Sequence, residues 1–247
     1  MWYGLKKSEI AELEALNKML LRKILDTPIS TPTEALQLEL GVMSISTIIK
    51  ARRINFLHYL VRRNEKEMIY KFFKTQWDYP VKDDWTTQVR QDLRDFEMSD
   101  NLDFIKSKSK YCFKNLVKEK AKKYELARLL EVKSTHSKMA NLKYHSLEIQ
   151  EYLKLDICNS TQAKTMFRFR CRMENFSENF RGIQGPQPCP LCGVHLDSQE
   201  KSFTCQKITQ VIDIASDYTE IFNTNIPPTL FKVIEKITQL REDSSNM

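Results

Sequence analysis

The feature that most constrains the fold is the length of the segments that run without a helix breaker. The 247 residues include only 5 glycines, well below the usual glycine content of about 7 %. Within these segments apolar residues recur at the three- and four-residue spacing of an amphipathic helix. We therefore expect an all-α protein, an irregular array of several helices with a small cysteine-rich zinc-knuckle loop near the C-terminus.

Capping residues indicate where individual helices begin and end. Gly41 is expected to end a short helix in the left-handed conformation, and Ser109 is a candidate cap for a basic helix. Ser160 is expected to cap a helix that runs through Met173.

An aromatic segment from Glu65 to Trp77 is expected to form another helix. Met68, Phe72 and Phe73 have the spacing of a helix face against a partner helix. We expect all three in the core rather than on a platform for nucleic-acid bases.

Metal-binding side chains gather in one short loop, Cys189-Pro190-Leu191-Cys192-Gly193-Val194-His195, which is followed by Cys205. Two cysteines separated by two residues can reach one tetrahedral ion, and Zn²⁺ prefers thiolate and imidazole ligands. Gly193 can adopt the positive φ of a tight turn. The pattern predicts one zinc site with Cys189, Cys192, His195 and Cys205 as ligands, and Lys201 occupies the place where many zinc knuckles carry a histidine.

The cysteine loop has two other interpretations. One is a former knuckle with two exposed thiols. The other is a redox pair, which would use a helix N-terminus to lower the pKa of its thiol. Gly185, Pro186 and Pro188 precede the loop and indicate irregular backbone, which disfavours the redox interpretation.

Basic residues outnumber acidic ones and give a net charge of +7, which favours an anionic partner. Two sets recur at four-residue spacing: Lys110, Lys114, Lys118 and Lys122 in the first, and Lys164, Arg168 and Arg172, with Arg170 nearby, in the second. Such a row of like charges repels itself unless an anion lies across it, so the backbone of RNA or DNA is the expected partner. The alternative is an ordinary solvated face of a helix.

Several classes of function are not expected. No run approaches the roughly 20 apolar residues of a membrane span, and the N-terminus lacks the apolar core of a signal peptide, so we expect an intracellular protein, nuclear or cytoplasmic. Asp83 and Asp84 precede a helix instead of lying on a hairpin between strands, which predicts a cap and not a catalytic metal site. Neither a glycine-rich phosphate loop nor a nucleophile-base set is found, so neither an enzyme nor a small-molecule substrate is expected.

Short motifs along most of the chain resemble the C-terminal region of non-LTR (LINE-like) retrotransposon reverse transcriptases. They are Trp2-Tyr3-Gly4-Leu5, Leu21-Arg22-Lys23-Ile24-Leu25, Ile48-Ile49-Lys50-Ala51-Arg52-Arg53, Lys71-Phe72-Phe73, Asp84-Trp85 and Cys189-Pro190-Leu191-Cys192. In that family a polymerase palm is followed by a helical thumb, a helical linker and a cysteine-rich knuckle that contacts nucleic acid. The resemblance implies that this chain begins after the palm.

The resemblance also implies a division and a function. The expected parts are a thumb-like segment (1–80), a basic helical linker (81–182), a zinc-knuckle-like loop (183–210) and a C-terminal helical segment (211–247). The expected role is non-catalytic: holding RNA template or target DNA, with the polymerase domain as a further partner. The rival expectation is a helical protein-interaction module or an inert remnant of a retroelement.

Overall fold

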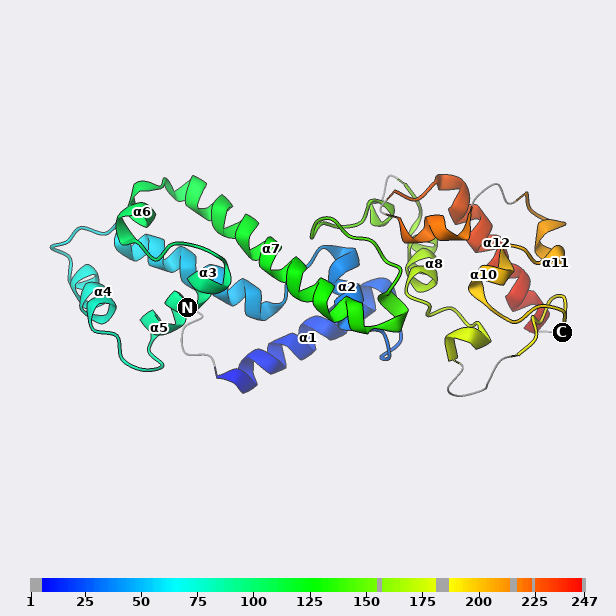
Figure 1. Cartoon of the computed structure of the whole chain (residues 1–247), viewed down its shortest axis with the longest axis horizontal. Coiled ribbons are helices and arrows are strands. Elements are labelled where there is room, and N and C mark those ends of the chain that lie inside the picture. The colour runs from blue at the N-terminus through cyan, green and yellow to red at the C-terminus, as the bar shows by residue number, and fades with distance from the viewer. Residues whose placement is uncertain (1–5, 155–156, 181–186, 214–216, 224, 246–247) are drawn as a thin grey trace. The chain divides into compact units, whose positions relative to one another are not determined.

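The computed structural model is all-helical in the residues that it describes (Figure 1). These are residues 6–154, 157–180, 187–213, 217–223 and 225–245. Within them no strand forms, and β-type pairing is limited to two isolated bridges, Leu40 with Ile149 and Pro188 with Leu196. The predicted fold class is therefore confirmed. No helix in the described part is both long and apolar enough to cross a membrane.

The chain divides into two compact units that alternate along the sequence. Unit 1 comprises Met1–Leu20 and Met43–Glu131, and unit 2 comprises Leu21–Val42 and Val132–Met247. The four consecutive parts expected from the sequence differ from this division. Residues 21–42 belong with the C-terminal half because α2 is tied there by buried contacts that no local pattern reveals.

The first half of the chain forms α-helices, most of them two or more turns long. They are α1 (Lys7–Leu25), α2 (Thr33–Leu40), α3 (Ile45–Val61), α4 (Met68–Asp78), α5 (Trp85–Asp95), α6 (Leu102–Ser107) and α7 (Lys110–Thr135). Shorter elements follow. They are η1 (Ser137–Met139), η2 (Glu151–Leu153), α8 (Ser160–Arg170), η3 (Ser177–Phe180), α10 (Gln199–Ser202), α11 (Gln206–Thr209), η4 (Tyr218–Phe222) and the long α12 (Pro228–Ser245).

The core of unit 1 forms where α3 packs against α4, α5 and α6. It includes Leu57 of α3, Trp77 of α4, Leu93 of α5 and Val117 of α7, all buried. Asp84 caps α5 by accepting a hydrogen bond from the backbone N–H of Thr87 at 2.8 Å. The predicted structural function of Asp84 is thus confirmed.

Helix α4 corrects the prediction for its aromatic segment. Phe73 is buried, together with Trp77 one turn later. Met68 and Phe72, by contrast, are 67 % and 66 % exposed. Adjacent positions on a helix are about 100° apart, so the face that Phe73 and Trp77 turn toward the core leaves Phe72 outside.

A buried carboxylate joins α7 to the start of α3 in unit 1. Glu125, which is fully buried, accepts hydrogen bonds from the N–H of Ser44 at 3.0 Å and from the hydroxyl of Thr47 at 2.6 Å. Arg128, one turn along α7, donates to the same carboxylate at 2.7 Å. Burial opposes ionisation of Glu125, but the bonds from Arg128, Thr47 and Ser44 outweigh it and lower its pKa. The carboxylate therefore fixes the N-terminus of α3.

A fully buried ion pair lies at the centre of unit 2. Arg170 of α8 donates from Nε to Glu39 of α2 at 2.9 Å, and both side chains are 0 % exposed. The hydroxyls of Tyr144 and Tyr152 donate to the two oxygens of Glu39 at 2.6 and 2.8 Å. Burial alone would lower the pKa of Arg170, and the attraction of Glu39 raises it above its ordinary value. Breaking such a pair on one side leaves an uncompensated buried charge.

The end of α2 depends on Gly41. Its φ of 63° is left-handed, and its N–H bonds back to the carbonyl of Gln37. A Cβ at this position would lie 2.3 Å from the carbonyl carbon of Glu148 and 2.4 Å from the nitrogen of Ile149. Both the turn and the close approach of a second segment therefore require glycine, and the predicted helix end is confirmed.

Candidate metal centre and basic helices

The cysteine loop folds as a narrow hairpin closed by its own backbone. The N–H of Cys189 donates to the carbonyl of His195 at 2.7 Å, and the N–H of Asp197 donates to the carbonyl of Gln187 at 2.8 Å. Inside the hairpin the N–H of Gly193 returns to the carbonyl of Cys189 at 2.8 Å. Gly193 has the expected positive φ, 67°, and a Cβ there would meet nothing within 4 Å. The requirement for glycine is one of backbone conformation alone.

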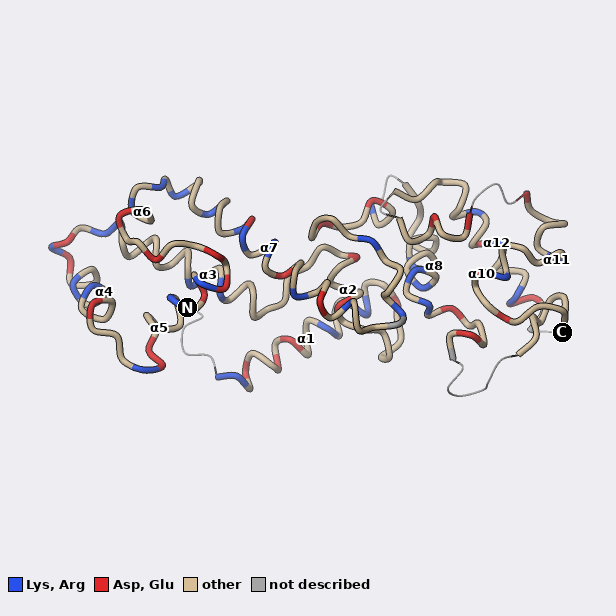
Figure 2. The backbone as a smooth tube through the Cα atoms, in the orientation of Figure 1, with Lys and Arg blue, Asp and Glu red and all other residues tan. Residues whose placement is uncertain are grey.

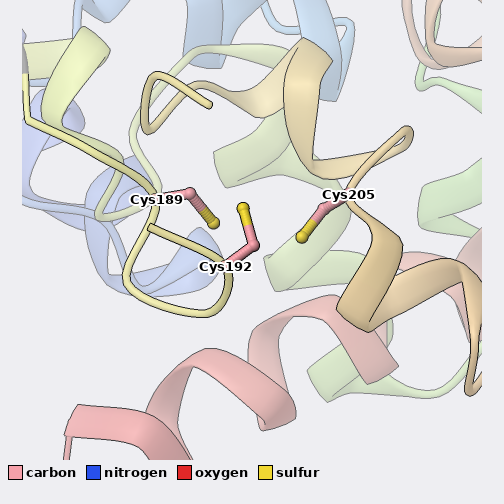
Figure 3. Close-up of side chains that lie close together, drawn as sticks. All are labelled: Cys189, Cys192 and Cys205. Atoms are coloured by element: carbon pink, nitrogen blue, oxygen red, sulfur yellow. The ribbon is translucent and has the colours of Figure 1, made fainter. Parts of the chain in front are cut away.

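Three thiols converge at the open side of this hairpin. The Sγ atoms of Cys189, Cys192 and Cys205 all lie within 4.8 Å of one another. In Figure 3 the three side chains point toward a common centre, two from the loop and Cys205 from the connection between α10 and α11. Thiolates around one tetrahedral ion at a metal–sulfur distance of about 2.3 Å lie about 3.8 Å apart, so the three residues can hold a metal ion.

Backbone hydrogen bonds favour the thiolate form of one ligand. Bonds from the N–H groups of His195 and Val194 lower the pKa of Cys192 to about 7. Burial raises the pKa of Cys205, and backbone bonds from Lys207 and Ile208 oppose that effect. The thiolate is the form that binds metal, and Cys192 reaches it near neutral pH.

His195 is not a member of the three-residue cluster found among the described residues. In the structure His195 contributes through its backbone. Its carbonyl accepts a hydrogen bond from the N–H of Cys189, and its own N–H faces the Cys192 thiol. Its imidazole as a fourth ligand stays a prediction. Lys201 lies on α10, where its N–H bonds to the hydroxyl of Ser198 at 3.1 Å.

The lysine row of α7 lies on the exposed side of that helix. Phe113, Val117 and Ala121 are buried on the opposite side, and Ser109 accepts from the N–H of Cys112 at 3.2 Å as the expected cap. The exposed members of the row are Lys110, Lys114 and Lys118, and Lys122 is half-buried. Among the residues that the structure describes, no ion pair involves Lys110, Lys114 or Lys118.

The second basic row does not form one surface. Helix α8 ends at Arg170, and Arg172 follows with a left-handed φ of 51°. Arg168 pairs with Glu174 at 2.8 Å, and Lys164 is half-buried. Arg170 is enclosed by its pairing with Glu39 and cannot reach nucleic acid, which corrects its assignment as a nucleic-acid contact.

Sequence patterns missed the acidic partners that decide which cations are available. Glu39 carries no motif, and its partner Arg170 lies 131 positions away. The one indication in the sequence that Arg170 is buried is the apolar run before it, Met166, Phe167 and Phe169, which is typical of a buried helix.

Comparison with known proteins identifies no relative for this chain. No family model matches it, no curated protein matches it, and no solved structure matches it. The functional conclusions therefore rest on the residues and their geometry.

Proposed function

We propose that this chain binds the phosphate backbone of nucleic acid through Lys110, Lys114 and Lys118 of α7, the exposed lysine face. The observation that carries the proposal is that these three ammonium groups are exposed on successive turns of a helix anchored by buried residues. Figure 2 shows basic residues recurring along α7. Cations at this spacing suit a polyanion, and contacts to phosphate give little sequence preference.

The setting that we propose is a non-LTR retrotransposon reverse transcriptase, to whose thumb, linker and knuckle region the sequence is similar. In that setting these residues hold RNA template or target DNA, and no catalytic step is assigned to them. The polymerase domain of such an enzyme is the second proposed partner.

We further propose that the ion held by Cys189, Cys192 and Cys205 is Zn²⁺, because a compact set of thiolates selects zinc over harder cations. The ion would join the hairpin to the start of α11 and contribute to the stability of unit 2. The imidazole of His195 is the proposed fourth ligand. This would require the side chain to turn toward the three thiols.

The lysine face can be tested with two matched triple variants of unit 1. In the α7 variant, Lys110, Lys114 and Lys118 become glutamine, and in the control the exposed Lys66, Lys71 and Lys82 become glutamine. Both lose three charges. Measured by fluorescence anisotropy with a short DNA duplex and a short RNA strand, the α7 variant should bind more than tenfold more weakly and the control nearly normally. Equal losses in both variants would reduce the effect to net charge and remove the proposed face.

The zinc assignment can be tested by elemental analysis of protein produced without added metal. The parent protein should carry about one zinc per chain, and Cys192→Ser should carry much less. Replacement of the exposed Cys112 by serine provides a matched control that keeps the metal. A parent protein free of zinc would contradict the assignment.

One observation favours a second candidate, a helical protein-interaction module. The exposed Phe72 and Ile69 of α4 border an apolar groove of about 200 Å³ that Phe56 and Trp85 also line. Phe72→Ser distinguishes the candidates because it removes an exposed ring and leaves the lysine face intact. Loss of a co-purifying protein, with no nucleic-acid binding in the parent, would favour the interaction module.

A further inference from the structure

Unit 2 contains a polar cavity of about 570 Å³. This volume lies in the range of pockets that hold small molecules. The residues that matter chemically come from distant parts of the chain. They are the cations Lys133, Lys143 and Arg172, the carboxylates Glu200 and Asp217, and the ring of Tyr218.

The three cations are held in place by neutral groups. Lys133 donates from Nζ to the carbonyl of Ala140 at 3.0 Å, and Lys143 donates from Nζ to the side-chain oxygen of Asn223 at 3.5 Å. Arg172 hydrogen-bonds to the hydroxyl of Tyr218. Within the described ranges, no ion pair neutralises Lys133, Lys143 or Arg172. The cavity therefore carries an excess of positive charge, and an anionic group would complete it.

Arg172 lines the cavity with an unusual backbone conformation. Its φ is 51°, in the left-handed region that residues other than glycine seldom adopt. Such strain gathers at ligand-binding positions. The turn follows directly after the end of α8 and places the guanidinium group at the cavity wall.

Tyr218 gives the cavity a rigid aromatic surface. Its ring packs edge-on against Phe203 and Phe222, with both centroid distances 5.4 Å. Burial raises the pKa of Tyr218 to about 12, so its hydroxyl stays protonated at neutral pH. Asp217 precedes it and accepts from the N–H of Thr219 at 3.0 Å, which fixes the direction of that carboxylate.

We propose that this cavity binds a nucleoside monophosphate, either free or at the end of a strand. The phosphate lies among Lys133, Lys143 and Arg172, and the base lies against Tyr218. Glu200 and Asp217 accept hydrogen bonds from sugar hydroxyls. Cations for phosphate, an aromatic ring for the base and carboxylates for the sugar together fit a nucleotide better than a simple anion. This site is separate from the lysine face, which contacts backbone phosphates and selects no single nucleotide.

Calorimetric titration of the parent protein tests the site with five probes: AMP, adenosine, inorganic phosphate, and a short oligonucleotide with and without a 5′-phosphate. AMP should bind at least tenfold more tightly than either adenosine or phosphate if the source is a free nucleotide. A tenfold preference for the phosphorylated oligonucleotide over its 5′-hydroxyl form would identify a strand end instead. If neither preference is found, the proposal is overturned.

Variants separate ligand binding from folding. Arg172→Gly suits the left-handed backbone, so it should keep or raise the melting temperature while weakening binding of the preferred probe at least tenfold. Lys143→Ala should weaken it severalfold, and Lys232→Ala, an exposed lysine of α12, provides the control. Unchanged binding in both Arg172→Gly and Lys143→Ala would overturn the assignment. The lysine-face variant leaves this site intact, so the two proposals can fail independently.

Discussion

Helices α7 and α8 carry basic residues at the same four-residue spacing, yet the structure places them in opposite environments. On α7 the opposite face is buried, and Lys110, Lys114 and Lys118 of the row are exposed. On α8 the helix itself is buried on most sides, with Met166, Phe167 and Phe169 inside. Arg170 of α8 forms a fully buried ion pair with Glu39, and Arg168 is paired with Glu174.

Four-residue spacing alone therefore does not make a binding surface. A basic row is available to a polyanion only where the fold supplies no carboxylate for it. Glu39 and Glu174 satisfy the arginines of α8. On α7, Lys110, Lys114 and Lys118 have no ion pair among the described residues, although Lys120 on the same helix pairs with Glu97.

Replacing Arg170 should have the largest effect on stability. Arg170→Met leaves the Glu39 carboxylate buried without its cation and should lower the free energy of unfolding by about 3–5 kcal/mol. Lys114→Met, the corresponding change on α7, should leave it nearly unchanged. Urea unfolding of the two variants compares them directly, and equal midpoints would contradict the contrast.

Replacing Glu125 should lower the free energy of unfolding by a smaller amount, and that amount should depend on pH. Its pKa is lowered in the folded state, so its stabilisation is present above the unfolded pKa of about 4.3 and is lost as the pH falls through the lower folded value. Glu125→Gln places an amide against donors and should cost roughly 1–3 kcal/mol at neutral pH.

The comparison with parent protein can be made by urea unfolding from neutral pH down to about pH 3. The difference in the free energy of unfolding between the parent and Glu125→Gln should become smaller as the pH falls. A deficit for Glu125→Gln that grows in acid would refute the assigned pKa direction.

Arg168 should have the smallest effect on folding. Its pair with Glu174 is partly exposed, and pairs of this kind contribute about 0–1 kcal/mol. Arg168→Gln should therefore shift the unfolding midpoint only slightly, and binding of a DNA duplex should stay within about twofold of the parent. A tenfold loss of binding would show that α8 presents a nucleic-acid surface after all.

Local patterns predicted those features whose causes are local. Gly41, Gly193 and the Asp84 cap depend on backbone geometry within a few residues, and the structure has each as expected. Cys205 was predicted beside the hairpin because its thiol suits the same metal ion as Cys189 and Cys192, and the three Sγ atoms do lie within 4.8 Å of one another.

Features that depend on distant partners were not predictable in this way. The burial of Arg170 requires Glu39, and the exposure of Phe72 requires the direction in which α4 meets α3. The cavity around Arg172 combines residues from five separate segments. Residue spacing within one helix does not indicate any of these partners, because each contact depends on how whole helices pack together.

The salt dependence of nucleic-acid binding, measured on the parent and the α7 triple variant, shows whether the exposed lysine face contacts phosphates. Each phosphate contact contributes about 0.9 to the slope of log affinity against log salt concentration on duplex DNA. The parent should bind more weakly as salt rises, and removal of Lys110, Lys114 and Lys118 should flatten the slope by about 2 to 3. Binding that is insensitive to salt, or an unchanged slope in the variant, would show that these lysines do not contact the phosphate backbone.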